Sequence, residues 1–255
     1  MVRIKTKVSA RSTEERTPDS ISPVDPFAPN HCGETWWGAY AWADSGIPKN
    51  LRQQIQIPGW GAIDHREGQL DHLLVGARQF AQWPWSRGFY ICGPVGCGKS
   101  LIAACMIREM ILTAPTARDI RRHVGSSNQV ENWYPRLRFV SVPRLLSRIR
   151  NTYGRRSAHE TKTEDIIEAY AGADVLVLDD LGAEGTTDWV REQLFELVDE
   201  RYGTMQPTIF TSNLTLDQLA KRISLRVADR IAEMCGDFIY TIDASSYRVK
   251  LRKER

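Results

Sequence analysis

Eight residues, GPVGCGKS at positions 93–100, restrict the possible fold of this chain more than any other feature. They satisfy the pattern G-x-x-x-x-G-K-[ST] and lie between the apolar run GFYIC and the helical pattern KSLIAACMIREMILTA. Glycines at this spacing let backbone N–H groups converge on phosphate oxygens beside the positive end of a helix dipole. We therefore expect a strand, a phosphate-binding loop and a helix. The loop residues expected to hold the nucleotide are Gly93, Pro94, Val95, Gly96, Cys97, Gly98, Lys99 and Ser100.

The chemistry expected at this loop is that of ATP with Mg²⁺. Lys99 would reach the β- and γ-phosphates, and the Ser100 hydroxyl would ligate Mg²⁺. The apolar run VLVLDD ends on Asp179, expected beside the metal, and on Asp180, placed to orient or deprotonate an attacking water. This favours hydrolysis over transfer to a small molecule. Glutamate is usual at the position of Asp180. Because aspartate is one methylene shorter, it should hold the attacking water less well, and slow turnover is expected.

A third element of the site is expected at the end of PTIFTSN, where Asn213 follows an apolar run. If this strand lies between the first and third strands, the amide of Asn213 faces the γ-phosphate and the attacking water. The alternative is an asparagine that only starts a turn.

Three arginines, Arg222, Arg226 and Arg230, recur four residues apart, and an apolar residue follows each of them. One predicted helix over 217–234 would carry all three on one face and pack the apolar neighbours inward. In the functional interpretation, one arginine reaches the γ-phosphate bound by the next subunit, which requires an oligomer. The alternative is a solvated basic face paired with acids such as Asp229.

Alternating apolar runs and helical patterns predict an α/β fold with a five-stranded parallel sheet between two helical layers. The expected strands are 88–92, 137–142, 173–182, 207–213 and 237–243, and the expected helices are 99–114, 143–153, 187–203 and 217–234.

The expected organisation is a flexible N-terminal arm over 1–30, a tryptophan-rich module over 31–65 and an ATPase domain over 66–255. Residues 116–136 are interpreted as a surface insertion. With 42% hydrophobic residues, 25% charged residues and a net charge of +3, the composition is that of an ordinary globular protein. No apolar run is long enough to span a bilayer and no signal peptide is evident, so a cytoplasmic location without membrane contact is expected.

Five cysteines without C-x-x-C spacing argue against a disulfide framework or a zinc ribbon. Cys92 and Cys105 are expected to be packed. Cys97, inside the phosphate loop, is either a spacer or a residue open to oxidation or alkylation.

Contacts to single-stranded DNA are suggested by RLLSRIRNTYGRR, which has five arginines, one tyrosine and no acid. Arg150 and Tyr153 stand close enough to meet one nucleotide. Thr187 is expected to cap the next helix, with Trp189 just inside it, where a phosphate and a base could bind. The alternatives are a basic helix end favoured by the helix dipole and a tryptophan that belongs to the core.

From Gly88 onward the chain resembles the bacterial helicase-loader family of AAA+ ATPases (the DnaC and DnaI proteins), with the IstB transposition helpers as close relatives. The matching segments are GPVGCGKS, RFVSVPRLL, VLVLDDLGAE, DWVREQLFELVDERY, PTIFTSNLT, RVADRI and the terminal SYR. The chain ends shortly after the fifth expected strand, so no C-terminal helical lid is expected.

The resemblance implies nucleotide chemistry at Lys99, Ser100, Asp179, Asp180 and Asn213. It also implies that Arg230, or next Arg226, acts as an arginine finger, and that Arg150, Tyr153, Thr187 and Trp189 face single-stranded DNA inside a homo-oligomeric spiral. The N-terminal module would grip a replicative DnaB-type hexameric helicase. Residues 1–60 lack the zinc ligands of one loader branch, and the 116–136 insertion is unusual for the family.

The function expected from the sequence is therefore that of an ATPase that loads a ring helicase onto single-stranded DNA. One alternative is an IstB-like helper that recruits a transposase through the same nucleotide chemistry. Another is a nucleotide-gated adaptor that binds DNA and a partner and does not require turnover. A small-molecule kinase is less favoured, because neither an acceptor pocket nor a lid is evident.

Overall fold

The computed structural model describes residues 45–54, 69–82, 85, 87–113, 135–152 and 163–243. Its helices are α2 (Lys49–Gln54), α3 (Gln69–Phe80), α4 (Lys99–Thr113), α6 (Val142–Arg150), α7 (Thr163–Ala171), α8 (Asp188–Gly203), α9 (Leu216–Arg222) and α10 (Leu225–Cys235). Its strands are β1 (Gly88–Cys92), β2 (Leu137–Ser141), β3 (Val175–Leu181), β4 (Thr208–Ser212) and β5 (Ile239–Thr241).

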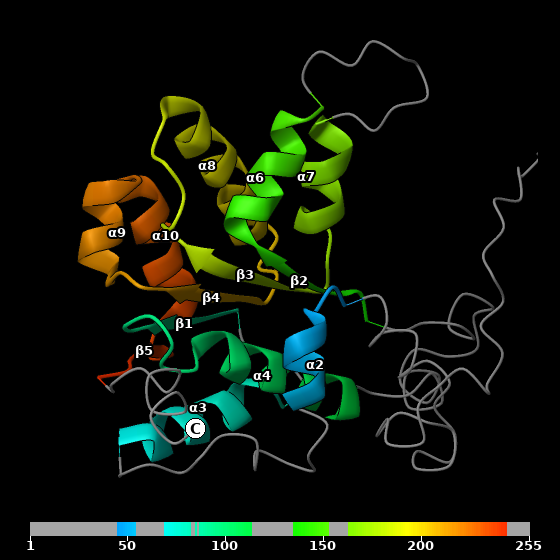
Figure 1. Ribbon diagram of the computed structural model, residues 1–255, viewed down its shortest axis with the longest axis vertical. Coiled ribbons are helices and arrows are strands. Elements are labelled where there is room, and N and C mark those ends of the chain that lie inside the picture. Colours follow the sequence, from blue (N-terminus) through cyan, green and yellow to red (C-terminus); the bar gives the residue numbers. More distant parts are fainter. Residues whose placement is uncertain are drawn as a thin grey trace, which may run out of the picture.

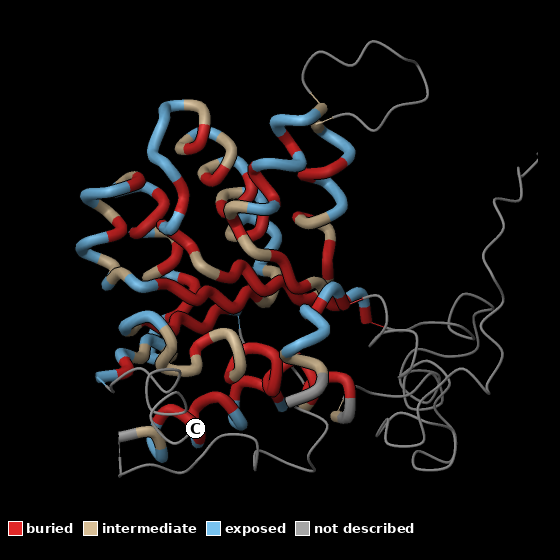
Figure 2. Tube along the Cα trace, viewed as in Figure 1, coloured by how far each residue is buried: buried red, intermediate tan, exposed pale blue. Residues whose placement is uncertain are grey.

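The strands form one parallel sheet in the order β2-β3-β4-β1-β5, which confirms the predicted α/β fold. The three inner strands, β3, β4 and β1, are almost entirely buried, as the central band in Figure 2 shows. Strand β4 lies between β1 and β3, so their carboxyl ends meet at one edge of the sheet. In an open parallel sheet this edge is where ligands bind.

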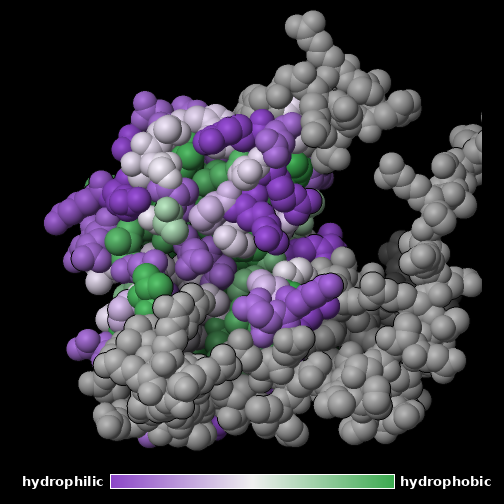
Figure 3. Space-filling model, viewed as in Figure 1, coloured by the Kyte–Doolittle hydropathy of each residue, from purple (hydrophilic) through white to green (hydrophobic). Residues whose placement is uncertain are grey.

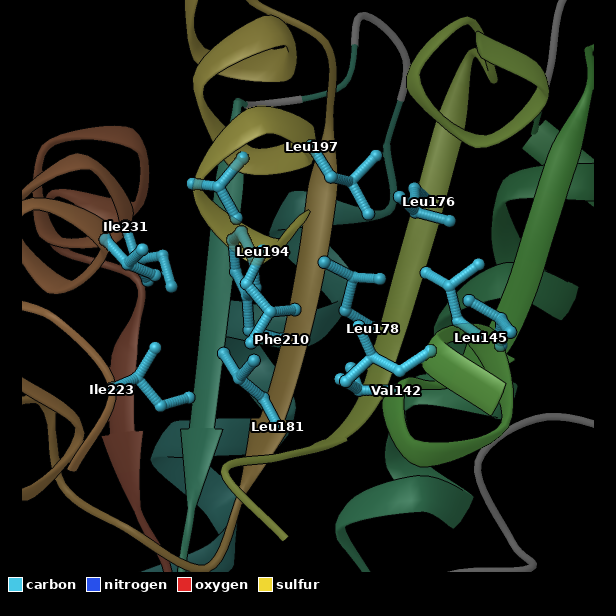
Figure 4. Packing of buried hydrophobic residues seen from close by; sticks show 14 of the residues in the cluster. Val142, Leu145, Leu176, Leu178, Leu181, Leu194, Leu197, Phe210, Ile223 and Ile231 are labelled. Carbon is cyan, nitrogen blue, oxygen red and sulfur yellow. The ribbon is translucent and has the colours of Figure 1, made fainter. Parts of the chain in front are cut away.

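Helices cover both faces of the sheet (Figure 1): α6 to α10 lie on one side, and α2, α3 and α4 on the other. Successive side chains of β3 point to opposite faces of the sheet. Val175 and Val177 belong to the core cluster with α4, whereas Leu176 and Leu178 pack with the residues of α6, α8 and α10 that Figure 4 shows. The predicted three layers are present.

The prediction of a single helix over 217–234 is wrong. Two helices, α9 and α10, occupy this stretch, and the chain between them leaves helical geometry at Ser224, which has an extended φ of −168°. Serine favours the position before a helix because its side chain competes for backbone hydrogen bonds. Arg222 therefore ends α9, while Arg226 and Arg230 lie on α10, so the three arginines do not form one stripe.

Part of the predicted 31–65 module packs against the sheet. Ile47 is buried in the α4-side core cluster, and the N–H of Phe139 donates to the carbonyl of Ser45 at 2.6 Å. Helix α2 packs on α4. The remainder of this module, the 1–30 arm, Tyr153 and nearly all of the 116–136 insertion lie outside the described residues. No helix in the described ranges is both long and apolar enough to cross a membrane.

Candidate nucleotide-binding site

The loop between β1 and α4 has the backbone geometry that its glycines predict. Gly98 has φ +105°, a conformation that residues with a Cβ rarely adopt. At Gly93, a Cβ would lie 2.6 Å from the carbonyl oxygen of Ile242, so no side chain fits there. Val95 is 64% exposed at the loop. Helix α4 starts directly at Lys99, so its free N-terminal N–H groups point at the loop's centre.

Lys99 is 5% exposed and its ammonium group is held by three oxygens. Nζ donates to the carbonyls of Gly93 and Pro94 and to Oδ1 of Asn213, each at 2.8 Å. These contacts match the three donors of a lysine ammonium group. Because β4 lies between β1 and β3, Asn213 at the end of β4 reaches the phosphate loop. This strand order is the condition under which the sequence predicts Asn213 at the site.

Asp179, at the end of β3, is a buried carboxylate that is 7% exposed. Its Oδ1 accepts a hydrogen bond from the Thr211 hydroxyl at 2.7 Å. Burial raises the pKa of Asp179, while hydrogen bonds from the side chains of Thr211 and Ser100 act in the opposite direction. A carboxylate and a hydroxyl in contact are oxygen ligands of the kind that Mg²⁺ prefers. Ser100 and Asp179 therefore fit the predicted metal site.

Asp180 lies beside Asp179 with an unusual backbone. Its φ is +59°, and its N–H donates to the Thr211 hydroxyl oxygen at 3.0 Å. The side chain is only half-buried, so it is accessible at the edge of the sheet. Both acids are predicted from the sequence, whereas Thr211, which contacts both, is not.

The loop that follows β3 is closed by Glu184, which is 7% exposed. The N–H of Gly182 donates to both carboxylate oxygens, at 3.1 and 3.2 Å, and Arg222 donates to the Glu184 carbonyl at 3.2 Å. Burial raises the pKa of Glu184, and backbone hydrogen bonds oppose the rise. This loop runs from the two acids to Thr187 and thereby ties the site to α8. Glu184 is not among the site residues predicted from the sequence.

The two arginines on α10 differ in their surroundings. Arg230 is paired with Asp199, and its guanidinium lies 4.4 Å from the ring centroid of Tyr202. Arg226 is exposed and makes no hydrogen bond or ion pair within the described part of the chain. Arg230 is thus held inside its own chain, whereas Arg226 is available.

Three of the four residues expected to meet DNA, Arg150, Thr187 and Trp189, lie at the junction of α6 and α8. The Arg150 guanidinium lies 5.1 Å from the Trp189 ring centroid, and the Thr187 hydroxyl accepts from the N–H of Val190 at 3.3 Å, so Thr187 caps α8. Trp189 is half-buried against the core. Tyr153 lies outside the described residues. The surface over these helices is mainly hydrophilic (Figure 3).

A five-stranded parallel sheet of this order, with a phosphate loop after β1 and acids at the end of β3, is the arrangement of a P-loop nucleotide-binding fold. Residues 132–255 match the family model described as IstB-like ATP binding protein. The resemblance predicted from the sequence is thereby confirmed. The phosphate loop itself precedes the matched range.

Relatives fall into several groups. The chain is 36% identical over 87 residues to the phage-like element PBSX protein XkdC of Bacillus subtilis, covering 32% of each protein. It is 28% identical to the insertion sequence IS1162 ATP-binding protein of Pseudomonas fluorescens, covering 68% of this chain and 67% of that protein. It is 25% identical to the replicative helicase loader DnaI of Bacillus subtilis, covering 66% and 45%.

Among solved structures, the crystal structure of the DnaC helicase loader has the same fold. The TM-score is 0.58 at 21% identity, and the similarity covers 77% of this chain and 100% of that one. The chain spans about a third of XkdC and less than half of DnaI.

Replacing Asp179 with asparagine is expected to stabilise the nucleotide-free protein at neutral pH. Because its folded pKa is raised, the stability linked to this carboxyl is full below its unfolded pKa and is lost as pH rises through the folded pKa. Without Mg²⁺ and with EDTA present, the variant should melt about 2–4 °C above wild type at pH 8, the shift that ~1 kcal/mol gives in a domain of this size.

The difference between Asp179→Asn and wild type should shrink as the pH is lowered towards the ordinary carboxyl range. Asp217→Asn, which changes an exposed acid in the first turn of α9, is the control and should show no such trend. Melting temperatures measured from pH 4.5 to 8 decide the point, and a lower melting temperature for Asp179→Asn at pH 8 contradicts it.

Proposed function

We propose that the protein is an ATP-dependent helicase loader that assembles on single-stranded DNA and delivers a replicative DnaB-type hexameric helicase. The observation that carries this proposal is the connection between two surfaces. The loop pinned by Glu184 runs from Asp180 to Thr187, and so joins the nucleotide site to the surface formed by Arg150 and Trp189. A change at the phosphates can therefore be transmitted to the DNA through a few residues.

The chemistry proposed for the site is slow hydrolysis of ATP. Lys99 exchanges loop carbonyls for phosphate oxygens, Asp180 orients the attacking water, and Asn213 hydrogen-bonds the γ-phosphate. Bound Mg²⁺, held by Ser100 and Asp179, would neutralise phosphate charge. Arg150, Tyr153, Thr187 and Trp189 are proposed to contact the strand, through phosphates and a stacked base.

The site is proposed to be completed by an arginine from α10 of a neighbouring copy. Arg226 can act without breaking a hydrogen bond or ion pair to any described residue, whereas Arg230 must first leave Asp199 and Tyr202. A guanidinium at the γ-phosphate stabilises charge in the transition state and links hydrolysis to assembly.

Alanine substitutions separate the two arginines. Arg226→Ala should lower hydrolysis in the assembled state by about 10³-fold, the lower end of the effect of such a residue, without changing the melting temperature. Arg230→Ala should lower both the rate of hydrolysis and the melting temperature, because it also removes the contacts to Asp199 and Tyr202. Steady-state ATPase assays with single-stranded DNA, paired with thermal melts, measure this. Full activity in both variants would contradict a shared site.

The test of loading is a pull-down with the replicative helicase encoded in the same genome, with ATP and with single-stranded DNA present or absent. Retention of the helicase, and its transfer to circular single-stranded DNA, is the expected result. Trp189→Ala should retain the helicase but weaken the response to DNA. Failure to retain any replicative helicase contradicts loading.

A second candidate function is that of an IstB-like transposition helper. The match of residues 132–255 to the IstB-like family and the similarity to the IS1162 protein favour it. A transposase encoded beside this gene, included in the same pull-down, distinguishes the two functions. Its retention in place of the helicase would decide for the helper.

A further inference from the structure

We propose that Thr211 is a positioning residue of the nucleotide site, which sets the metal-binding carboxylate and the water-orienting carboxylate with one hydroxyl group. The inference rests on the ATPase site proposed above and adds a residue to it. It is carried by the pairing of β3 with β4, by two hydrogen bonds and by the burial of Thr211.

Strand β3 contains one residue more than β4 at the site. Leu178 pairs with Phe210 and Leu181 pairs with Ser212, so Asp179 and Asp180 together lie opposite Thr211 alone. Two residues facing one define a β-bulge, a feature that redirects side chains next to active sites.

The packing of Leu181 identifies the extra residue. Strict alternation from Leu176 and Leu178 would turn Leu181 to the opposite face of the sheet. Leu181 packs instead in the same cluster as these two leucines, near Phe210 (Figure 4). Asp180, with its φ of +59°, is thus the inserted residue, and its side chain belongs to neither of the two core clusters that cover the faces of the sheet.

The Thr211 hydroxyl occupies the centre of the bulge. It donates to Oδ1 of Asp179 at 2.7 Å and accepts from the N–H of Asp180 at 3.0 Å. Thr211 is fully buried, so no water competes for either bond. A left-handed backbone in a non-glycine residue is uncommon and persists where surrounding contacts hold it. Thr211 supplies such a contact.

A hydroxyl in this position does two things for the chemistry. It fixes Oδ1 of Asp179 and so sets the orientation of the carboxylate that also accepts a hydrogen bond from Ser100. It also fixes the backbone from which the Asp180 side chain projects. Removal of the hydroxyl should therefore affect the use of Mg²⁺ and the rate of bond cleavage, and leave phosphate binding by the loop in place.

The same strand offers a matched control. Thr208 is also buried on β4, and its hydroxyl bonds Gln206 and the guanidinium of Arg201 at the other end of the strand. Thr211→Val and Thr208→Val are thus the same chemical change, each removing a buried hydroxyl with two partners. Only Thr211→Val removes a hydroxyl group that is hydrogen-bonded to Asp179 and Asp180.

The experiment compares wild type, Thr211→Val, Thr211→Ser and Thr208→Val in the full chain. The affinity for a fluorescent ATP analogue is measured with Mg²⁺ and with EDTA, together with kcat, KM and the melting temperature. In Thr211→Val, affinity in EDTA should stay within about threefold of wild type. The tightening produced by Mg²⁺ should fall about tenfold and kcat at least tenfold, amounts consistent with loss of a group that orients metal ligands.

Thr211→Ser, which keeps the hydroxyl, should restore both properties to within about threefold. Thr208→Val should lower the melting temperature and leave the Mg²⁺ effect unchanged. If Thr211→Val does not fold, Thr211→Cys, with a weakly donating thiol, takes its place and should show the same loss to a smaller degree.

The proposal is overturned if Thr211→Val keeps the wild-type response to Mg²⁺ and a kcat equal to that of Thr208→Val. A wild-type protein that hydrolyses ATP but retains no helicase contradicts loading, while the comparison at Thr211 still decides this proposal. A wild-type protein that binds no ATP analogue overturns both.

Discussion

Replacement of Arg201 with leucine is expected to lower the free energy of unfolding by about 3–5 kcal/mol. Arg201 is completely buried in α8. It donates to the carbonyls of Tyr170, Ala171, Ala173 and Pro207 and to the hydroxyl of Thr208, over 2.5–3.2 Å. Burial lowers the pKa of Arg201 to about 9, so the group is still charged at pH 7.

Arg201 holds the end of α7, the turn before β3 and the start of β4 together, so its loss leaves several buried oxygens without a donor. The melting temperature should fall by roughly 6–20 °C at about 2–4 °C per kcal/mol. Arg201→Lys should recover little, because an ammonium group cannot reproduce the planar arrangement of donors.

The control is Arg191→Leu on the same helix, where the arginine pairs with exposed Asp188. A partly exposed pair of this kind is worth about 0.2–1 kcal/mol. Urea unfolding and thermal melts of the three variants measure the differences. An Arg201→Leu protein within 1 kcal/mol of wild type, or equal to Arg191→Leu, would show that the acceptors find other donors.

Replacement of Asp180 with asparagine is expected to lower kcat for ATP hydrolysis by about 10²–10⁴-fold, the contribution of a positioned general base. Asparagine tolerates a positive φ as aspartate does, so the bulge should persist. Affinity for ATP should stay within about threefold, because Lys99 and the loop are untouched. Asp217→Asn is the matched control and should hydrolyse ATP at the wild-type rate.

The same variant tests whether turnover is needed at all. If Asp180→Asn binds ATP, fails to hydrolyse it and still loads the helicase, the protein is a nucleotide-gated adaptor. If Asp180→Asn hydrolyses ATP normally, Asp180 does not orient the water. Single-turnover assays and a helicase-loading assay on the same preparation give both results.

Features set by local patterns could be predicted from the sequence. The apolar runs gave five parallel strands, and the glycine spacing gave the loop before α4. The position of Asn213 followed from one assumption about strand order, that β4 lies between β1 and β3, which the structure confirms. Pro143 at the start of α6 and Thr187 as the cap of α8 also follow from rules that involve only neighbouring residues.

Features set by contacts between distant segments could not be predicted in the same way. The bulge at Asp180 depends on the pairing of β3 with β4, and a single sequence gives no register. Arg201 did leave a trace, because it lies on the buried face of α8 three residues after Val198 and four after Leu197. A charged residue at an apolar position of a helix indicates a buried hydrogen-bond network, so the burial of Arg201 was predictable from the helical period.

The break between α9 and α10 and the existence of α7 were missed for related reasons. The helical pattern continues through Ser224, and only the capping preference of serine argues for a break. Helix α7 is short, and its buried residues, Ile166, Ile167 and Ala171, are too few to make a clear period. In both places tertiary packing decides the structure.

The three oxygens around the Lys99 ammonium have a consequence for the end of the reaction cycle. A buried cation left bare by a departing product would be unstable, and that instability would hold ADP in place. Here the carbonyls of Gly93 and Pro94 and the amide of Asn213 can take the ammonium back as the phosphates leave. In the proposed ATPase cycle these three oxygens replace the departing phosphates as partners of Lys99, so we expect ADP exchange to be faster than ATP cleavage.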